Sequence, residues 1–197
     1  MMTKKILYFD TASKSNTEAT LKAALERAKE LGLKDIVVAS STGATGVLAC
    51  EIFKGFKVTV VTTQVGIIEP GVRQLTDENE KKILELGGKI LTCTHALAGA
   101  ERAIRTKWNT MEPVEIIAQA LKIFGQAAKV CVETVIMAAD AGSIPLDSDV
   151  IAVAGTNRGA DTAFVVKPVH ANNLFSMVVR EIICKPRGPM PRPEGSH

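Results

Sequence analysis

The chain has 197 residues, a size typical of one domain with a substantial core. Apolar residues make up 46% of it and aromatic residues only 4%, so the core must consist mainly of Ala, Val, Ile and Leu. The formal net charge is +3, which gives no electrostatic reason to expect a nucleic-acid partner. Because the sequence lacks a membrane-length apolar run and a secretory signal, we expect a cytoplasmic protein without a membrane partner.

The first predicted elements are a strand over residues 6–9 and a helix over 17–31. Apolar residues at helical spacing support the helix, Gly32 ends it, and Ser15 or Asn16 is placed to cap its start. Polar side chains thus lie at a strand-to-helix junction, the edge where open α/β sheets bind ligands. For any one of them, simple helix capping is the better interpretation.

A strand, a helix and a second strand are predicted next, over residues 36–39, 47–53 and 57–63. Both strands are apolar and rich in β-branched residues, which is typical of strands buried on both faces. Together they predict a βαβ unit, which is almost always right-handed.

The loop of this unit, SSTGATG at 40–46, contains no bulky side chain. Its two glycines let a ligand approach the backbone, and the amide hydrogens at the helix start favour an anion. The hydroxyls of Ser41, Thr42 and Thr45 add further donors. The spacing matches neither the dinucleotide fingerprint nor the ATP-type phosphate loop. A phosphate site and a tight turn with a helix cap are therefore both open.

The rest of the chain continues the α/β pattern. Helices are predicted over 77–86 and 113–124, a helical segment over 97–106, and a further helix, favoured by its alanines, over 127–139. Strands are predicted over 89–94, 149–155, 163–166 and 177–184. Residues 1–184 thus form one predicted domain. Residues 185–197 hold four prolines and end in Gly-Ser-His, which predicts an extended tail with an expression-tag remnant.

A second polar loop, 156–162, follows the strand at 149–155. Arg158 could clamp a phosphate in bidentate fashion, and Asp161 could accept hydrogen bonds from sugar or polyol hydroxyls. The alternative is a hairpin turn with a local Arg–Asp pair, which is weak at a surface. Because this loop and the 40–46 loop each follow a buried strand, their joint presence favours a ligand site.

His95 follows the strand predicted at 89–94. It is a weak candidate for a general acid or base, or for a donor to a heteroaromatic ring, and a structural hydrogen bond is equally open. A phosphate-ester enzyme using His95 and Asp161 is a further hypothesis. Cys93 and His95 lack further ligands at suitable spacing, so no metal site is predicted. The four cysteines are far apart and are expected to be buried free thiols.

Residues 35–63 resemble the C-terminal α/β domain of pyruvate kinase, in which the corresponding loop belongs to an effector-phosphate site. The whole chain resembles a small group of stand-alone archaeal proteins with this fold and no assigned activity. The stretches that carry the resemblance are SSTGATG (40–46), THALAGAERA (94–103), AADAGSIP (138–145), VAGTNRGADTA (153–163) and EIICKPR (181–187).

The resemblance implies a three-layer α/β fold with a mostly parallel sheet flanked by helices, and flavin mononucleotide (FMN) as the ligand. It places the phosphate on residues 42–46 and the ribityl chain or ring near residues 157–162, Asn16 and His95. The catalytic barrel of pyruvate kinase has no counterpart here, so pyruvate kinase activity is not expected. The candidate binding residues are Asn16, Ser41, Thr42, Gly43, Ala44, Thr45, Gly46, His95, Asn157, Arg158, Gly159, Asp161 and Thr162.

Two functions remain open at this point. The first is a cytoplasmic FMN-binding protein of unassigned reaction, an oxidoreductase if it is an enzyme. The second is a non-catalytic sensor of a phosphorylated metabolite. Because pyruvate kinase domains assemble through their faces, the analogy also raises homo-oligomer formation.

Overall fold

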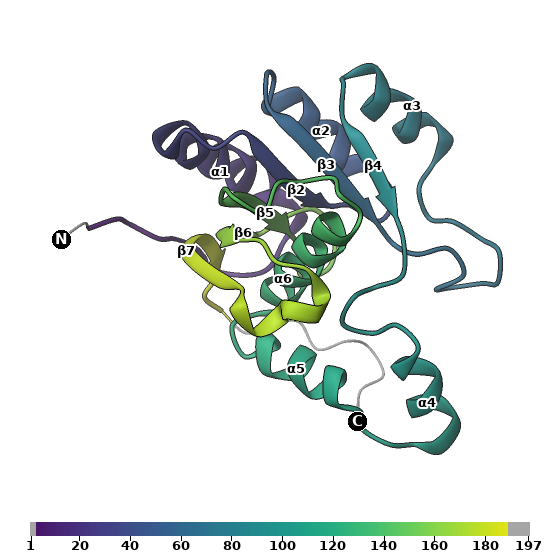
Figure 1. The fold of residues 1–197 in the computed structure, drawn as a ribbon. Helices are drawn as coiled ribbons and strands as arrows, with labels where there is room; N and C mark the ends of the chain where they lie inside the picture. The colour runs from purple at the N-terminus through teal and green to yellow at the C-terminus, as the bar shows by residue number, and fades with distance from the viewer. Residues whose placement is uncertain (1–2, 189–197) are drawn as a thin grey trace.

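A seven-stranded sheet is the middle layer of the structure, a computed structural model in which residues 3–188 are described (Figure 1). The strands are β1 (Leu7–Phe9), β2 (Asp35–Ala39), β3 (Lys57–Thr62), β4 (Lys89–Thr92), β5 (Val150–Ala154), β6 (Thr162–Lys167) and β7 (Val178–Pro186). The α-helices are α1 (Thr17–Leu31), α2 (Ala44–Ile52), α3 (Asp77–Glu85), α4 (Glu101–Trp108), α5 (Pro113–Lys122) and α6 (Gln126–Asp140). Residues 3–188 also contain the 3₁₀ helices η1 (Lys14–Asn16) and η2 (Ala171–Ser176).

The strand order across the sheet is β1-β7-β6-β5-β2-β3-β4. Only β6 runs against the others, because it pairs antiparallel with both β5 and β7 while every other pair is parallel. The mostly parallel sheet predicted from the sequence is therefore confirmed. Its carboxyl edge receives the loops that follow β1, β2, β3, β4 and β5.

Helices cover both faces of the sheet, which makes the three layers. On one face, Ile36 and Val38 of β2 join a core cluster with Leu21 of α1 and Ala49 of α2. On the other face, Val37 lies in a cluster with the buried residues of α6. This alternation follows from the two-residue period of a strand and explains why central strands are apolar throughout. Helix α3 packs against α2 and β4, and α5 packs against α6 (Figure 1).

Several predicted boundaries were wrong. Helix α2 begins at Ala44 and not at residue 47, so the last three residues of the glycine loop belong to its first turn. Helix α4 begins at Glu101 and not at residue 97, because the preceding residues form turns. Strand β7 continues to Pro186, two residues into the predicted tail, because Phe9 of β1 pairs with it. The remaining tail, 189–197, lies outside the described residues.

Asn16 occupies the N-cap position of α1, one of the two positions predicted for the cap. The Asn16 side chain makes no capping hydrogen bond, and its Nδ2 group donates to the Thr11 carbonyl at 2.8 Å. Instead, Ser13 Oγ accepts from the Ser15 N–H at 3.2 Å and so caps the 3₁₀ turn that precedes α1. The loop after β1 is therefore held by its own short hydrogen bonds.

The four cysteines are free, and Cys50, Cys131 and Cys184 are buried as predicted, whereas Cys93 is only half-buried. Burial raises the pKa of the Cys50 thiol to about 11 and that of Cys184 to about 12, so both stay protonated near neutral pH. In residues 3–188, we find no helix with the length and apolar character needed to cross a membrane.

Candidate functional site

Two polar loops leave neighbouring strands at the carboxyl edge of the sheet. Val38 of β2 is paired with Val153 of β5. Ser40 and Gly155, each two residues further along, therefore occupy equivalent positions at the ends of the two strands. Parallel strands lie about 4.8 Å apart, which puts the starts of both loops side by side. The sheet edge thus brings together two of the stretches that the sequence singled out.

The first loop turns sharply at Gly43, whose φ of 90° is a conformation that glycine alone adopts readily. There is also no space for a side chain, because a Cβ atom would lie 2.6 Å from Asn79 Cβ and 2.7 Å from Leu75 Cδ1. The Thr42 carbonyl accepts a hydrogen bond from Asn79 Nδ2 at 2.9 Å. The start of α2 is therefore fixed against the start of α3.

The first turn of α2 presents free donors. Ser40 Oγ accepts from the Gly46 N–H at 3.1 Å, and the Val47 N–H donates to the Gly43 carbonyl at 2.9 Å. Within residues 3–188, the N–H groups of Ala44 and Thr45 have no acceptor. Such groups, together with the positive end of the helix dipole, favour an anion.

Hydroxyl groups surround these free amides. Ser41 and Thr42 are exposed and Thr45 is half-buried. Thr63, which directly follows β3, donates from its Oγ1 to Ser41 Oγ at 2.8 Å. Thr63 was not predicted as a site residue, although its position at a strand end is the same feature that identified Ser41.

Gly46 serves packing within this arrangement. It is buried, and a Cβ atom there would lie 2.7 Å from Val60 Cγ1 and 3.1 Å from Ile83 Cδ1. Its missing side chain lets α2 approach β3 closely. The structure thus gives Gly46 a role without any ligand.

The second loop is the turn of the β5–β6 hairpin, as in the alternative weighed in the sequence analysis, but within residues 3–188 Arg158 and Asp161 form no ion pair. Asp161 is only 1% exposed, and its carboxylate accepts hydrogen bonds from the Thr156 N–H at 3.0 Å and from Thr162 Oγ1 at 2.8 Å. Thr162 is itself buried. Asp161 and Thr162 therefore close the hairpin from inside, and neither presents a polar group to the surface.

Asn157 and Arg158 lie at the exposed tip of the same hairpin. With Ala12, Ser13 and Lys14 they line a cavity of about 170 Å³. The absence of a side chain at Gly159 lets the hairpin tip pack closely against the loop after β1 and the start of α1, because a Cβ atom there would lie 2.2 Å from Thr17 Oγ1. Thr17 Oγ1 also accepts from the Ala160 N–H at 3.0 Å.

The loop that contains Asn16 and the hairpin that contains Arg158 therefore meet. Ser13 and Lys14 were not predicted as site residues. Their place just after β1 was the available indication.

His95 lies at the other end of the same edge. Its Nε2 accepts from the backbone N–H of Gln64 at 3.4 Å, and the backbone N–H of His95 donates to Gln64 Oε1 at 3.3 Å, which ties the end of β4 to the end of β3. Burial lowers the pKa of His95, Lys129 and Arg102 lower it further, and Glu133 opposes them. His95 is thus a mostly neutral, structural acceptor here.

The lowered pKa of His95 predicts how the stability of the protein depends on pH. The unfolded chain binds the His95 proton more readily than the folded chain, so stability falls as the pH drops below the ordinary value of 6.5. We expect the free energy of unfolding to decrease more between about pH 7.5 and about pH 5.5 in the wild type than in His95→Gln. Denaturant melts of both proteins at the two pH values measure this difference, and equal losses would contradict it.

Residues 3–188 contain no group of three or more His, Cys, Asp or Glu side chains placed to hold a metal ion.

The layers and the edge loops define a three-layer α/β domain of the doubly wound kind. The chain belongs to the pyruvate kinase alpha/beta domain family, whose sequence model matches residues 18–166.

Two solved structures are similar to the chain. A crystal structure of a pyruvate kinase from Cryptosporidium parvum is 17% identical with a TM-score of 0.39, and the match covers 78% of this chain and 23% of that one. A Cryptosporidium parvum pyruvate kinase in complex with ADP is 18% identical with a TM-score of 0.37, and the match covers 79% of this chain and 23% of that one. The chain thus spans about a quarter of the length of these kinases.

Proposed function

We propose that this chain binds a phosphorylated small molecule at the carboxyl edge of its sheet. The observation that carries the proposal is the pair of free N–H groups of Ala44 and Thr45 at the start of α2, surrounded by exposed hydroxyls. A phosphate dianion accepts several charge-assisted hydrogen bonds, so it gains most from such a donor set. The exposed guanidinium of Arg158, on the loop after the neighbouring strand, supplies positive charge at the same edge.

FMN is the ligand that we propose to test first. Its phosphate suits the donors of residues 41–45. For its ring, the loop between β3 and α3 offers the exposed aliphatic side chains of Val65, Ile68 and Val72. The loops of this edge contain no Phe, Tyr or Trp, so the ring would lie against aliphatic groups and backbone. When bound, the flavin would carry electrons, and the chain's own residues would bind and orient it.

Titration with FMN and with riboflavin tests the proposal. We expect FMN to bind at least about tenfold more tightly, because riboflavin lacks the phosphate that the α2 amides would bind. An absorbance scan of the purified protein shows first whether a flavin is already bound. Equal affinities would contradict a phosphate site at residues 41–45, and binding of neither compound would contradict the choice of a flavin.

Arg158→Ala should weaken FMN binding without affecting riboflavin binding. Lys54→Ala is the matched control, since this exposed lysine follows the far end of α2, at the opposite edge of the sheet. Unchanged FMN affinity in Arg158→Ala would remove Arg158 from the proposed site.

Binding of a phosphorylated metabolite without catalysis is the second candidate. It is favoured because both titratable groups proposed for catalysis already have partners. His95 Nε2 accepts from a backbone N–H, and both Asp161 oxygens accept hydrogen bonds inside the hairpin. A colourless protein that binds a sugar phosphate or nucleotide but no flavin would support this candidate over the first.

A further inference from the structure

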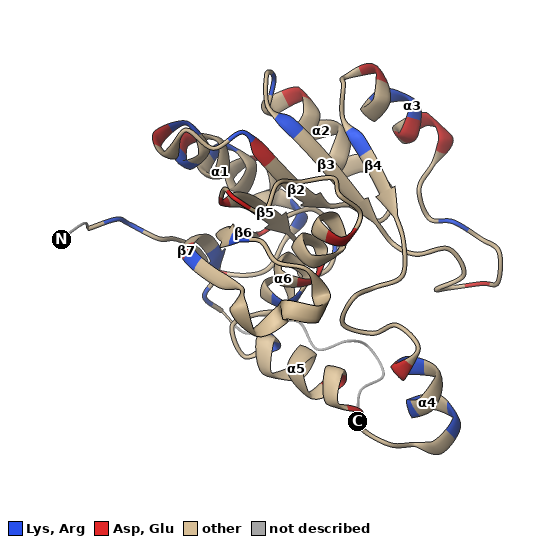
Figure 2. Ribbon diagram, in the orientation of Figure 1, with Lys and Arg blue, Asp and Glu red and all other residues tan. Residues whose placement is uncertain are grey.

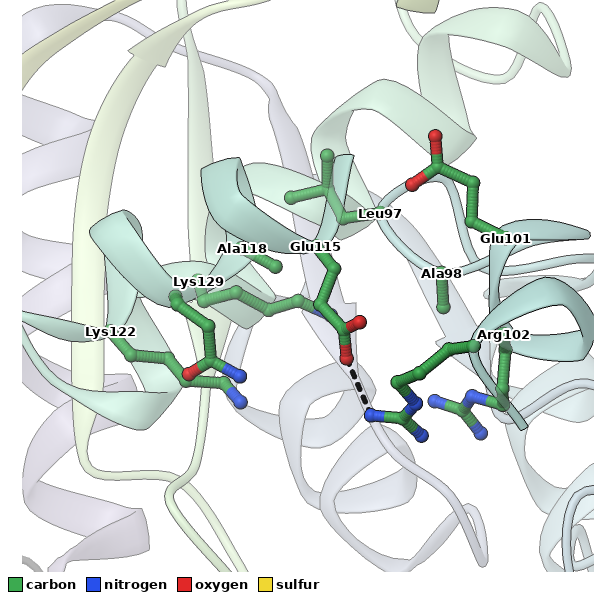
Figure 3. A pocket seen from close by; sticks show the side chains of 10 residues that line it. Leu97, Ala98, Glu101, Arg102, Glu115, Ala118, Lys122 and Lys129 are labelled. Carbon is green, nitrogen blue, oxygen red and sulfur yellow. Dashed lines mark hydrogen bonds and ion pairs between the residues drawn. The ribbon is translucent and has the colours of Figure 1, made fainter. Parts of the chain in front are cut away.

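A cavity of about 100 Å³ lies next to the segment that follows β4, whereas the proposed function uses the loops that follow β2, β3 and β5 (Figure 3). The 97–105 segment, α5 and the start of α6 line it, with Leu97, Ala98 and Ala118 as its apolar part. Most of one wall comes from the THALAGAERA stretch, residues 94–103, for which the proposed function has no use.

Four cations from three helices surround this cavity. Arg102 and Arg105 belong to α4, Lys122 to α5 and Lys129 to α6. Lys122 and Lys129 reach it from one side and Arg102 from the other (Figure 3). Among the described residues, Glu101 and Glu115 are the only carboxylates in the lining, so its net charge is +2, or +1 when Glu133, the partner of Lys129, is included.

The two carboxylates of the lining already have partners. Glu115 pairs with Arg105 at 2.5 Å, and Glu101 Oε2 accepts from the Val114 N–H at 3.0 Å. In the part of the chain that the structure describes, Arg102 and Lys122 have no anionic partner. Figure 2 shows that basic residues outnumber acidic ones along α4. The acidic side chains of this helix therefore do not neutralise its basic ones.

The fourth cation, Lys129, lies deeper. Its side chain is only 12% exposed, and its Nζ lies 2.5 Å from Glu133 Oε2. Burial lowers the pKa of Lys129, and Lys122 and Arg102 lower it further by repulsion, against the opposing effect of Glu133. These cations therefore face one another across a partly buried space, an arrangement that a bound anion would relieve.

We propose that this cavity is a second binding site, for a tetrahedral oxyanion held by Arg102, Lys122 and Lys129. Its volume equals that of about three water molecules, which suits one phosphate group but not a nucleoside. A phosphate carries a charge of about −1.5 to −2 near neutral pH, which is opposite in sign to the net positive charge around the cavity. The planar fork of Arg102 gives bidentate contacts to two phosphate oxygens. The same chemistry serves inorganic phosphate and the phosphate group of a small metabolite.

Calorimetric titration with inorganic phosphate at constant ionic strength tests the proposal. We expect the double variant Arg102→Gln, Lys122→Gln to bind phosphate at least about tenfold more weakly than the wild type. The matched control is Lys54→Gln, Lys81→Gln, which removes two exposed lysines far from the cavity and should bind as the wild type does. Equal affinity in the two double variants would overturn the proposal.

Phosphate can also bind at the start of α2, so the two sites must be separated. Thr45→Val changes only the proposed carboxyl-edge site and should leave the cavity's phosphate affinity unchanged. Loss of phosphate binding in Thr45→Val alone would overturn the second site and leave the first. Loss in the Arg102, Lys122 variant alone would support the second site whatever the outcome for FMN.

A stability measurement gives an independent result. Without phosphate and at low salt, Arg102→Gln should raise the melting temperature, because it removes a repulsive charge. In saturating phosphate the wild type should gain more stability than the variant. A variant that is less stable than the wild type in both conditions would contradict repulsion in the free cavity.

Parallel titrations with inorganic phosphate and glycerol phosphate identify the source of the anion. Binding of both compounds supports a metabolite's phosphate group, and binding of inorganic phosphate alone supports the free ion. Binding of neither compound overturns the site.

Discussion

Replacing Glu133 with alanine is expected to lower the free energy of unfolding by about 3–5 kcal/mol. The Glu133 side chain is 5% exposed, and its two oxygens accept from Lys129 Nζ at 2.5 Å and from the Leu97 N–H at 3.0 Å. Removing it leaves a mostly buried ammonium group and a buried backbone donor without partners. Urea unfolding of the wild type and the variant measures the loss.

The chain holds a matched control for this prediction. Lys81 and Glu85 on α3 have the same four-residue spacing and order as Lys129 and Glu133, but their side chains are 78% and 62% exposed. Glu85→Ala should therefore cost only a small fraction of the loss seen in Glu133→Ala. The double variant Lys129→Met, Glu133→Leu should recover much of that loss, because no charge is left uncompensated. Equal losses in Glu133→Ala and Glu85→Ala would show that burial of the pair does not matter.

Gly43→Ala is expected to destabilise the chain by about 2–4 kcal/mol, the sum of a positive φ and a steric clash. The new Cβ would lie 2.6 Å from Asn79 Cβ and 2.7 Å from Leu75 Cδ1, so α2 and α3 must move apart. That movement would also displace the amides of Ala44 and Thr45, so phosphate affinity at the proposed carboxyl-edge site should fall. Thermal unfolding and FMN titration of the same variant measure both effects.

Gly55→Ala separates the clash from the backbone effect. Gly55 has a φ of 83°, close to that of Gly43, but no atom lies within 4 Å of a Cβ placed there. Its substitution should cost only the positive-φ part, about 1–2 kcal/mol. Equal losses in the two variants would contradict the close packing of Gly43 against α3.

Local pattern was sufficient for most elements of the fold. Residues 36–39 of β2 and the whole of β5 are continuous runs of Val, Ile and Ala, and α6 is an alanine-rich apolar stretch, so composition alone predicted them. The errors at the ends of α2 and β7 have a non-local cause. Gly43 starts the helix early because α3 packs beside it, and β7 is extended by pairing with β1.

The site was predictable where backbone conformation follows from residue type, and less so where burial decides. Glycines in a strand-to-helix loop correctly indicated the tight turn at Gly43. The sequence could not show that Asp161 points inward, because a carboxylate in a polar loop is normally exposed. It could not reveal the Arg102, Lys122 and Lys129 cavity either, since three helices must first fold to bring those cations together.

The pairing of β1 with β7 has a consequence for how the chain folds. Leu7 lies opposite Cys184, so this contact joins segments separated by nearly the whole described sequence, whereas β2, β3 and β4 each pair with a strand that is close in sequence. Closing a long loop costs entropy before any contact compensates for it. The β2–β3–β4 half is therefore expected to assemble early, and the strand order to be completed last at β1. The loop after β1, with Ser13 and Lys14, would thus be among the final parts of the carboxyl edge to take its place.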